Sequence, residues 1–109
     1  MTAIEKIKAM HLAVSDNVYH YHAWRENDRY FEWQERAPDD FLADGVHVER
    51  AVQGITDYFT KMEYDPHIDE FEVSMNETPG VAWSRNSEQY EEETGFIHIE
   101  WYWSVVADG

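Results

Sequence analysis

The segment FIHIEWYWSVV, residues 96–106, restricts the possible folds more than any other part of the sequence. Apolar or aromatic residues occupy every second position from Ile97 to Val105, and the positions between them are mixed in character. This alternation is typical of a β-strand that buries one face. Tryptophans that share a face with isoleucine and valine are more simply explained as core than as a platform for a sugar ring. The predicted core positions of this strand are Ile97, Ile99, Trp101 and Trp103.

A partner strand is predicted just before this segment, over residues 81–90, so that the two strands form one long C-terminal β-hairpin. Residues 91–95 are the predicted turn, because Gly95 can adopt a positive φ angle. The turn opens with three consecutive glutamates. Neighbouring carboxylates at a hairpin tip stay hydrated, so they lack the raised pKa and the fixed spacing that glycosidase acids need. The run is therefore interpreted as a solvated turn and not as a catalytic pair.

Two helices are predicted from their start signals and their apolar spacing. Thr2 and Glu5 form a capping-box pattern at the start of a helix over residues 3–14. Asp65 is a good N-cap for a second helix, and Pro66 suits its first position. The apolar face of the second helix is predicted to consist of Ile68, Phe71 and Met75.

Strands are predicted between the helices over residues 18–23, 29–35 and 46–61, with a loop over 37–45. The third segment is ambiguous, because its apolar residues also fit helical spacing. Gly54 and the β-branched and aromatic residues around it favour a strand. The whole order predicts an α+β fold, in which an antiparallel sheet ends in the long hairpin and packs against two helices. A chain of 109 residues suits a single domain.

The charge and cysteine content exclude several classes of partner and chemistry. The chain has 23 acidic and 8 basic residues, a formal net charge of -15. Tight binding to nucleic acid or to an anionic membrane surface is therefore not expected. The absence of cysteine excludes disulfides and thiolate chemistry. No apolar run approaches the roughly 20 residues that span a bilayer, and the N-terminus lacks the apolar core of a signal peptide. A cytoplasmic site of synthesis is expected.

The histidines and the acids of residues 65–72 are candidate metal ligands by residue type. The run VYHYHA places His20 and His22 at alternating positions, so one strand face would carry both imidazoles, and His47, His67 or His98 could add a third. No motif with a defined metal geometry is present. The acids of residues 65–72 lack the order of an EF-hand loop and are interpreted as the polar face of the second helix. No serine lies in a nucleophile motif. The sequence predicts no enzyme, no metal and no cofactor.

Four quoted segments carry a resemblance to a known family. They are VYHYHA, FEWQE, AVQGITDYFTK followed by DPHIDE, and VAWSRNSEQYEEETGFIHIEWYWSV. Together they resemble tail-completion or tail-terminator proteins of siphophages and prophages of Gram-positive bacteria. The resemblance extends over residues 18–106 and is most specific over residues 83–103. It implies one tail-terminator-like domain over residues 1–109.

The resemblance implies a virion assembly protein at the junction of tail and head. Such a protein would act as a ring, commonly a hexamer, that caps the tail tube and contacts the major tail protein and the head-tail connector protein. Acidic residues would line a channel that DNA crosses without adhering, or a subunit surface. Surplus aromatic residues would serve subunit contacts. The candidates for the acidic surface are Glu91, Glu92 and Glu93.

Three other functions stay open. One is a small acid-base enzyme, which a pocket containing two buried carboxylates would favour. A head-closure or minor capsid component from the same gene region would share most of these features. A small-ligand or carbohydrate-binding module, which belongs to a different class, would use the five tryptophans and seven tyrosines. Exposed coplanar tryptophan rings in a groove would favour the binding module.

Overall fold

Seven helices and strands make up the computed structural model, which describes residues 1–24, 27–36 and 51–108. The five strands form one sheet in the order β1-β2-β3-β5-β4. All neighbouring strands are antiparallel except β1 and β2, which are parallel. The predicted α+β fold with a C-terminal β-hairpin is confirmed. The elements are α1 (Ala3–Leu12), β1 (Val18–His20), β2 (Arg29–Arg36), β3 (Ala51–Thr60), α2 (Pro66–Glu77), β4 (Val81–Glu91) and β5 (Phe96–Val106).

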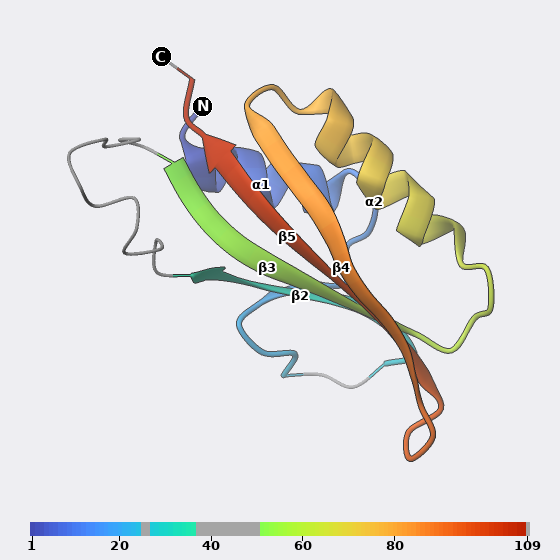
Figure 1. Ribbon diagram of the computed structural model, residues 1–109. Coiled ribbons are helices and arrows are strands. Elements are labelled where there is room, and N and C mark those ends of the chain that lie inside the picture. Colours follow the sequence, from blue (N-terminus) through green and yellow to red (C-terminus); the bar gives the residue numbers. More distant parts are fainter. Residues whose placement is uncertain (25–26, 37–50, 109) are drawn as a thin grey trace.

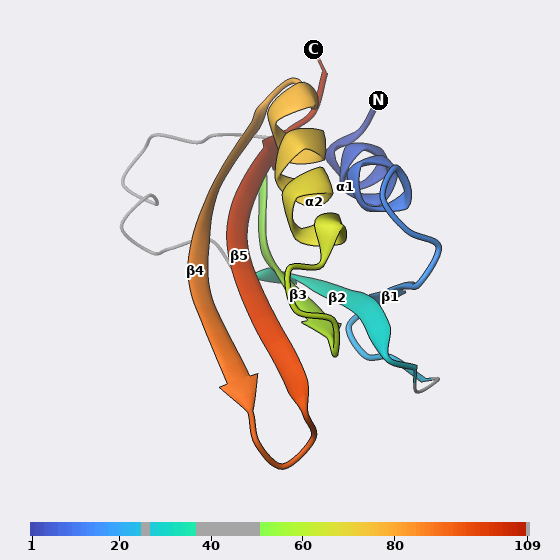
Figure 2. The same cartoon turned by 90° about the vertical axis from the view of Figure 1, so that its right-hand side faces the viewer.

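Both helices lie on the same face of the sheet (Figures 1 and 2). α1 contacts β3 and β5, and α2 contacts β4 and α1. Among the described residues, no helix covers the opposite face, which we call the outer face. Tyr30 of β2, Phe59 of β3 and Phe96 of β5 lie on it. The turn of the β4–β5 hairpin extends well beyond the helices (Figure 1).

The helix starts follow the predicted capping. The Thr2 hydroxyl accepts a hydrogen bond from the Glu5 amide at 3.1 Å, and the Thr2 amide donates to the Glu5 carboxylate at 2.8 Å. Asp65 is the N-cap of α2 and accepts from the His67 amide at 2.9 Å. Both predicted helix starts are confirmed. α1 ends at Leu12, two residues before the predicted end.

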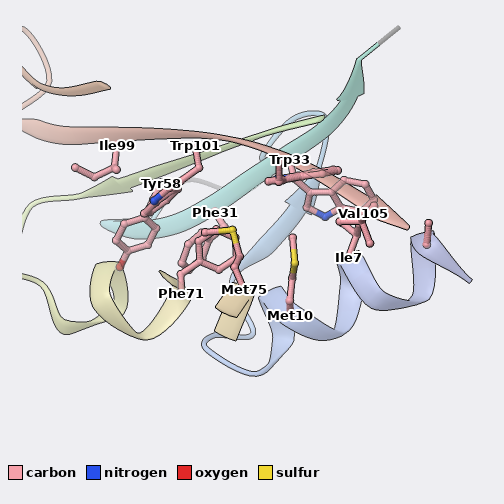
Figure 3. Close-up of a cluster of buried hydrophobic side chains, with 12 residues drawn as sticks. Ile7, Met10, Phe31, Trp33, Tyr58, Phe71, Met75, Ile99, Trp101 and Val105 are labelled. Carbon is pink, nitrogen blue, oxygen red and sulfur yellow. The ribbon is translucent and has the colours of Figure 1, made fainter. Parts of the chain in front are cut away.

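The hydrophobic core lies between the helices and the sheet (Figure 3). Trp101 and Trp103 are 0% and 3% exposed, so both tryptophans of β5 belong to this core. Ile99 is also fully buried, and Ile97 is partly buried and packs against the cluster. The core residues from other elements include Ile7, Met10, Phe31, Trp33, Tyr58, Phe71 and Met75.

Gly54 has a packing role in the ambiguous third segment, which is a strand over residues 51–60. A Cβ atom at this position would lie 2.3 Å from Cη2 of Trp103 and 2.5 Å from the carbonyl oxygen of Gln34. Only glycine allows the Trp103 ring to approach the backbone of β3 this closely. The strand prediction is confirmed for residues 51–60, whereas residues 46–50 and the predicted loop over 37–45 lie outside the described residues.

The first predicted strand is shorter than expected. β1 ends at His20, whereas the prediction extended to residue 23. Tyr21 has a φ angle of 72°, so the backbone leaves the extended conformation there. The alternation VYHYHA therefore does not continue as a strand, because a left-handed residue interrupts the pleat.

His11 is a fully buried polar residue on the inner side of α1. Its Nδ1 atom is 2.6 Å from the Ile7 carbonyl oxygen, and its Nε2 atom is 2.7 Å from the Thr56 hydroxyl. A carbonyl oxygen can only accept, so Nδ1 is the donor and Nε2 accepts from Thr56. The Trp103 indole in turn donates to the Thr56 hydroxyl at 2.7 Å. A neutral imidazole therefore satisfies the whole chain of hydrogen bonds.

Acidification is expected to destabilise the fold through His11. Burial lowers the pKa of His11 from 6.5 to about 4, although the hydrogen bond to Ile7 opposes this effect. Between these two pH values the unfolded chain binds a proton on His11 more readily than the folded chain does. The stability that neutral His11 contributes is therefore complete above pH 6.5 and falls as the pH drops toward 4. We expect a loss of about 2 kcal/mol between pH 7 and pH 5. Urea unfolding at both pH values measures it. His11→Leu should lose this part of the pH dependence, and an unchanged dependence in that variant would contradict the assignment.

Candidate functional site

The outer face carries a hollow of about 520 Å³ at the end of the sheet near the hairpin turn. It spans the ends of four strands, because its lining comes from β2, β3, β4, β5 and the residues that flank them. We call it the aromatic hollow. Its lining residues are Asn27, Asp28, Tyr30, Phe59, Lys61, Glu91, Thr94 and Phe96.

Three aromatic rings form the base of the aromatic hollow. Tyr30 and Phe59 are paired across β2 and β3, and their rings stack with centroids 4.9 Å apart and planes 21° apart. The Phe96 ring meets Phe59 edge-on at 6.0 Å and Tyr30 edge-on at 5.9 Å. Each of the three residues is partly exposed. Strand alternation places these three rings on the outer face, opposite the core side of the sheet. The molecule therefore presents aromatic surface there in addition to its aromatic core.

Charged groups surround the three rings. The ammonium of Lys61 lies 4.9 Å from the centre of the Phe96 ring and 3.6 Å from the carboxylate of Asp28. On the side of β4, the Glu91 carboxylate accepts a hydrogen bond from the Thr94 hydroxyl at 3.1 Å. The aromatic hollow thus has carboxylates on both the β2 side and the β4 side.

His98 fixes the position of Glu91 beside the hollow. Its Nε2 atom is 2.7 Å from Asp57, and its Nδ1 atom is 3.3 Å from Glu91. Its ring stacks on Phe59 at 4.3 Å. The hydrogen bond with Asp57 raises the pKa of His98 against the opposing effect of burial, and the charge of Glu91 adds to the rise. When protonated, His98 donates to both carboxylates and ties the hairpin to β3.

The three glutamates of the predicted acidic surface lie in different environments. Glu91 is the last residue of β4 and is partly buried against His98. Glu92 and Glu93 are exposed in the turn, and Gly95 has the predicted positive φ angle, 78°. Only Glu91 lines the aromatic hollow.

His20 and His22 do not share a strand face, so that prediction is wrong. His20 stacks on the core residue Trp33 at 3.9 Å and pairs with Glu35, whereas His22 lies 3.7 Å from Glu32, on the opposite face of β2. The physical reason is the left-handed Tyr21 between them. Across residues 1–24, 27–36 and 51–108, no three histidine, aspartate or glutamate side chains come together to hold a metal ion. His47 lies outside these ranges.

Asp65 was predicted on the polar face of the second helix, but its carboxylate is buried. It accepts hydrogen bonds from the Arg29 guanidinium, from the Tyr58 hydroxyl at 2.6 Å and from the Thr60 hydroxyl at 2.7 Å. Burial alone would raise the pKa of Asp65, but these bonds and that of the His67 amide outweigh it and hold the pKa well below its usual range. The cluster joins β2, β3 and α2, and with its polar atoms satisfied it is a structural element.

The sequence pattern did not point to Tyr30, Phe59 or Phe96 as site residues. The available signal was the presence of aromatic residues at outer-face positions of three alternating strands, since such positions are more often polar. That signal does not show which aromatic residues converge, because convergence depends on the strand order. Lys61 and Asp28 carried no signal at all.

Comparisons with known proteins give no further assignment. No protein-family model matches the chain, and no curated protein matches it. α1 and α2 both fall short of the length and apolar character that a membrane-spanning helix requires.

Proposed function

We propose that this chain is a phage assembly protein that caps the tail tube and joins it to the head connector as a ring. The resemblance of residues 18–106 to tail-completion proteins supplies the phage context. The structural observation that carries the proposal is the outer face, which bears an aromatic hollow beside a hairpin that projects beyond the helices. Partly exposed aromatic rings with a charged border are typical of protein interfaces.

The sheet edge supplies a second surface suitable for contact. β4 is an edge strand of 11 residues, and within the described residues it pairs only with β5. Tyr90 on this strand is 65% exposed. A closed ring needs two different surfaces on each subunit, because each copy contacts one neighbour with one surface and the next neighbour with the other. An edge strand and an outer face meet this requirement.

The excess of acids supports a channel that DNA can cross. With a net charge of -15, the assembled chain would repel phosphate at any surface lined by its carboxylates. Glu92 and Glu93 lie exposed at the projecting turn, so they are suited to face such a channel or a neighbouring subunit.

The carbohydrate-binding alternative finds less support. Three of the five tryptophans, Trp33, Trp101 and Trp103, are buried, so they cannot contribute to a surface platform. In the aromatic hollow, Phe96 stands edge-on to the other two rings, so the three do not form one flat platform for a sugar.

Self-association is expected to be weak at low salt and to strengthen with added salt or magnesium, because like charges repel over roughly 8–10 Å at near-physiological ionic strength. Sedimentation across a salt series measures this response.

The double variant Glu92→Gln/Glu93→Gln should assemble at lower salt than the wild type. The control Glu63→Gln/Glu77→Gln removes two exposed acids elsewhere and should behave like the wild type, although its net charge changes equally. An oligomer that dissociates as salt rises would show that ion pairs hold the ring, and would remove the support for an acidic channel.

Electron microscopy of the chain mixed with tail tubes tests the function itself. Density added at one end of the tubes, together with tubes that stop growing, is the expected result. Binding to the head connector without binding to tubes would identify a head-closure protein instead. If neither binds and no oligomer forms at any salt concentration, the proposal is wrong.

A further inference from the structure

We propose that the aromatic hollow binds an arginine side chain presented by a partner protein. This inference rests on the proposed function, since it names the chemistry by which an assembly partner would dock on the outer face. Three features of the hollow support it: the ring surface, the position of the carboxylates, and a cation that the hollow already holds.

One ring face suits a planar cation. Tyr30 and His98 stack on Phe59, whereas the Phe96 ring has the ammonium of Lys61 over it at 4.9 Å, so the Phe96 face is the one that a cation can reach. Guanidinium groups stack on aromatic faces and are more weakly hydrated than ammonium groups, so arginine loses less on leaving water. A hollow of about 520 Å³ lies within the usual size range of ligand sites, and so can take the side chain with part of its backbone.

The carboxylates lie where a guanidinium could reach them. Asp28 precedes β2 and Glu91 ends β4, and these strands flank β3 and β5 in the sheet. A cation over the Phe96 ring would therefore have a carboxylate on either side. His98 contacts Glu91 and the Phe59 ring, and so holds both in place. Since arginine donates in a fixed fork, it can stack and hydrogen-bond to a carboxylate together.

A cation of the chain itself already uses part of this site. Among the described residues of the lining Lys61 is the basic one, and its ammonium lies 4.9 Å from the Phe96 ring centre. Its side chain is 46% exposed and its ion pair with Asp28 spans 3.6 Å, so water competes for both contacts. An incoming guanidinium can displace it at small cost. With a net charge of -15, the chain attracts cationic partners and repels anionic ones.

Titration of the whole chain with the tripeptide acetyl-Gly-Arg-Gly-amide, followed by nuclear magnetic resonance, tests the proposal. The matched probe replaces arginine with citrulline, which has the same shape and no charge. We expect the arginine peptide to shift the signals of Tyr30, Phe59 and Phe96 at millimolar concentration, and the citrulline peptide to bind at least about threefold more weakly.

Two variants sharpen the test. Lys61→Met removes the internal cation and should strengthen binding of the arginine peptide about threefold. Phe96→Leu should weaken it by a similar factor. Tyr90→Leu, which changes an exposed aromatic residue outside the hollow, is the control and should leave binding unchanged. Melting temperatures measured in parallel show whether each variant is folded, and Lys61→Met keeps the test valid if Phe96→Leu is not.

Several results would overturn the proposal. Equal binding of the arginine and citrulline peptides would show that charge is not recognised. Shifts spread over acidic residues on all faces would show general attraction to an acidic protein. Shifts of the same ring signals by methyl glucoside but not by arginine would identify a sugar site. The peptide test uses the isolated chain and needs neither ring nor tube. Tube capping without arginine binding would therefore refute this inference alone, whereas arginine binding without capping would refute the proposed function.

Discussion

Trp101→Ala is expected to lower the free energy of unfolding by about 3–5 kcal/mol, the range found when a large buried ring is removed from a core. The Trp101 side chain is fully buried, its ring lies 4.9 Å from that of Phe71, and its indole donates to Glu72 at 2.8 Å. Its loss leaves a cavity between sheet and helix and removes one hydrogen bond from Glu72, whose carboxylate stays paired with Arg85. Urea unfolding monitored by circular dichroism measures the change.

Trp24→Ala is the matched control, because this tryptophan is 77% exposed. We expect its effect to stay below about 1 kcal/mol. Domains of this kind have roughly 5–15 kcal/mol of stability in total, so Trp101→Ala could fail to accumulate as folded protein. Trp101→Phe keeps most of the buried ring and should show an intermediate loss. Equal stabilities for Trp101→Phe and Trp24→Ala would contradict the central place of Trp101 in the core.

Asp65→Asn is expected to cost about 3–5 kcal/mol, the usual penalty for removing one partner of a buried ion pair. The neutral amide leaves the Arg29 guanidinium without its counter-charge. It also cannot accept all the hydrogen bonds that the carboxylate now receives from Tyr58, Thr60 and the His67 amide. Chemical unfolding at pH 7 measures the cost.

Asp69→Asn is the control for this prediction, since Asp69 is an exposed acid in the first turn of the same helix. Its change should remain within about 1 kcal/mol. The folded pKa of Asp65 lies below the unfolded one, so the stability from its charge is complete above about pH 4 and falls as the pH drops below that value. The wild type should therefore lose its advantage over Asp65→Asn in acid. A constant difference between the two proteins down to pH 2 would contradict the assigned role.

Elements with a strong periodic pattern could be predicted from the sequence. The two arms of the hairpin, both helix starts and the buried face of β5 follow from alternation, caps and apolar spacing, which are local properties. In the sequence, Gly54 favours a strand over residues 46–61 because glycine is unfavourable within a helix. The structure shows a different role for this residue, since the missing side chain gives room to the Trp103 ring.

Features set by distant parts of the chain could not be predicted. Asp65 was recognised as a cap, but its burial depends on Arg29, which lies 36 positions earlier in the sequence. The parallel pairing of β1 with β2 and the convergence of Tyr30, Phe59 and Phe96 both depend on the strand order. Lys6 is another example, because it is 3% exposed and donates to the carbonyls of Pro79 and Val106. A helical lysine carries no local signal for such burial.

The irregularity in β4 has a consequence for the behaviour of the free chain. The register with β5 shifts between Arg85 and Ser87, and Asn86 at this point bonds to Glu100 across the sheet. A bulge twists an edge strand and interrupts its row of backbone donors and acceptors. Regular strands from other molecules therefore cannot keep adding to the β4 edge. The acidic side chain of Glu88 on the same strand also disfavours fibre formation, because stacked copies would place like charges together. Selective docking at an open edge and protection from aggregation can thus come from the same extra residue.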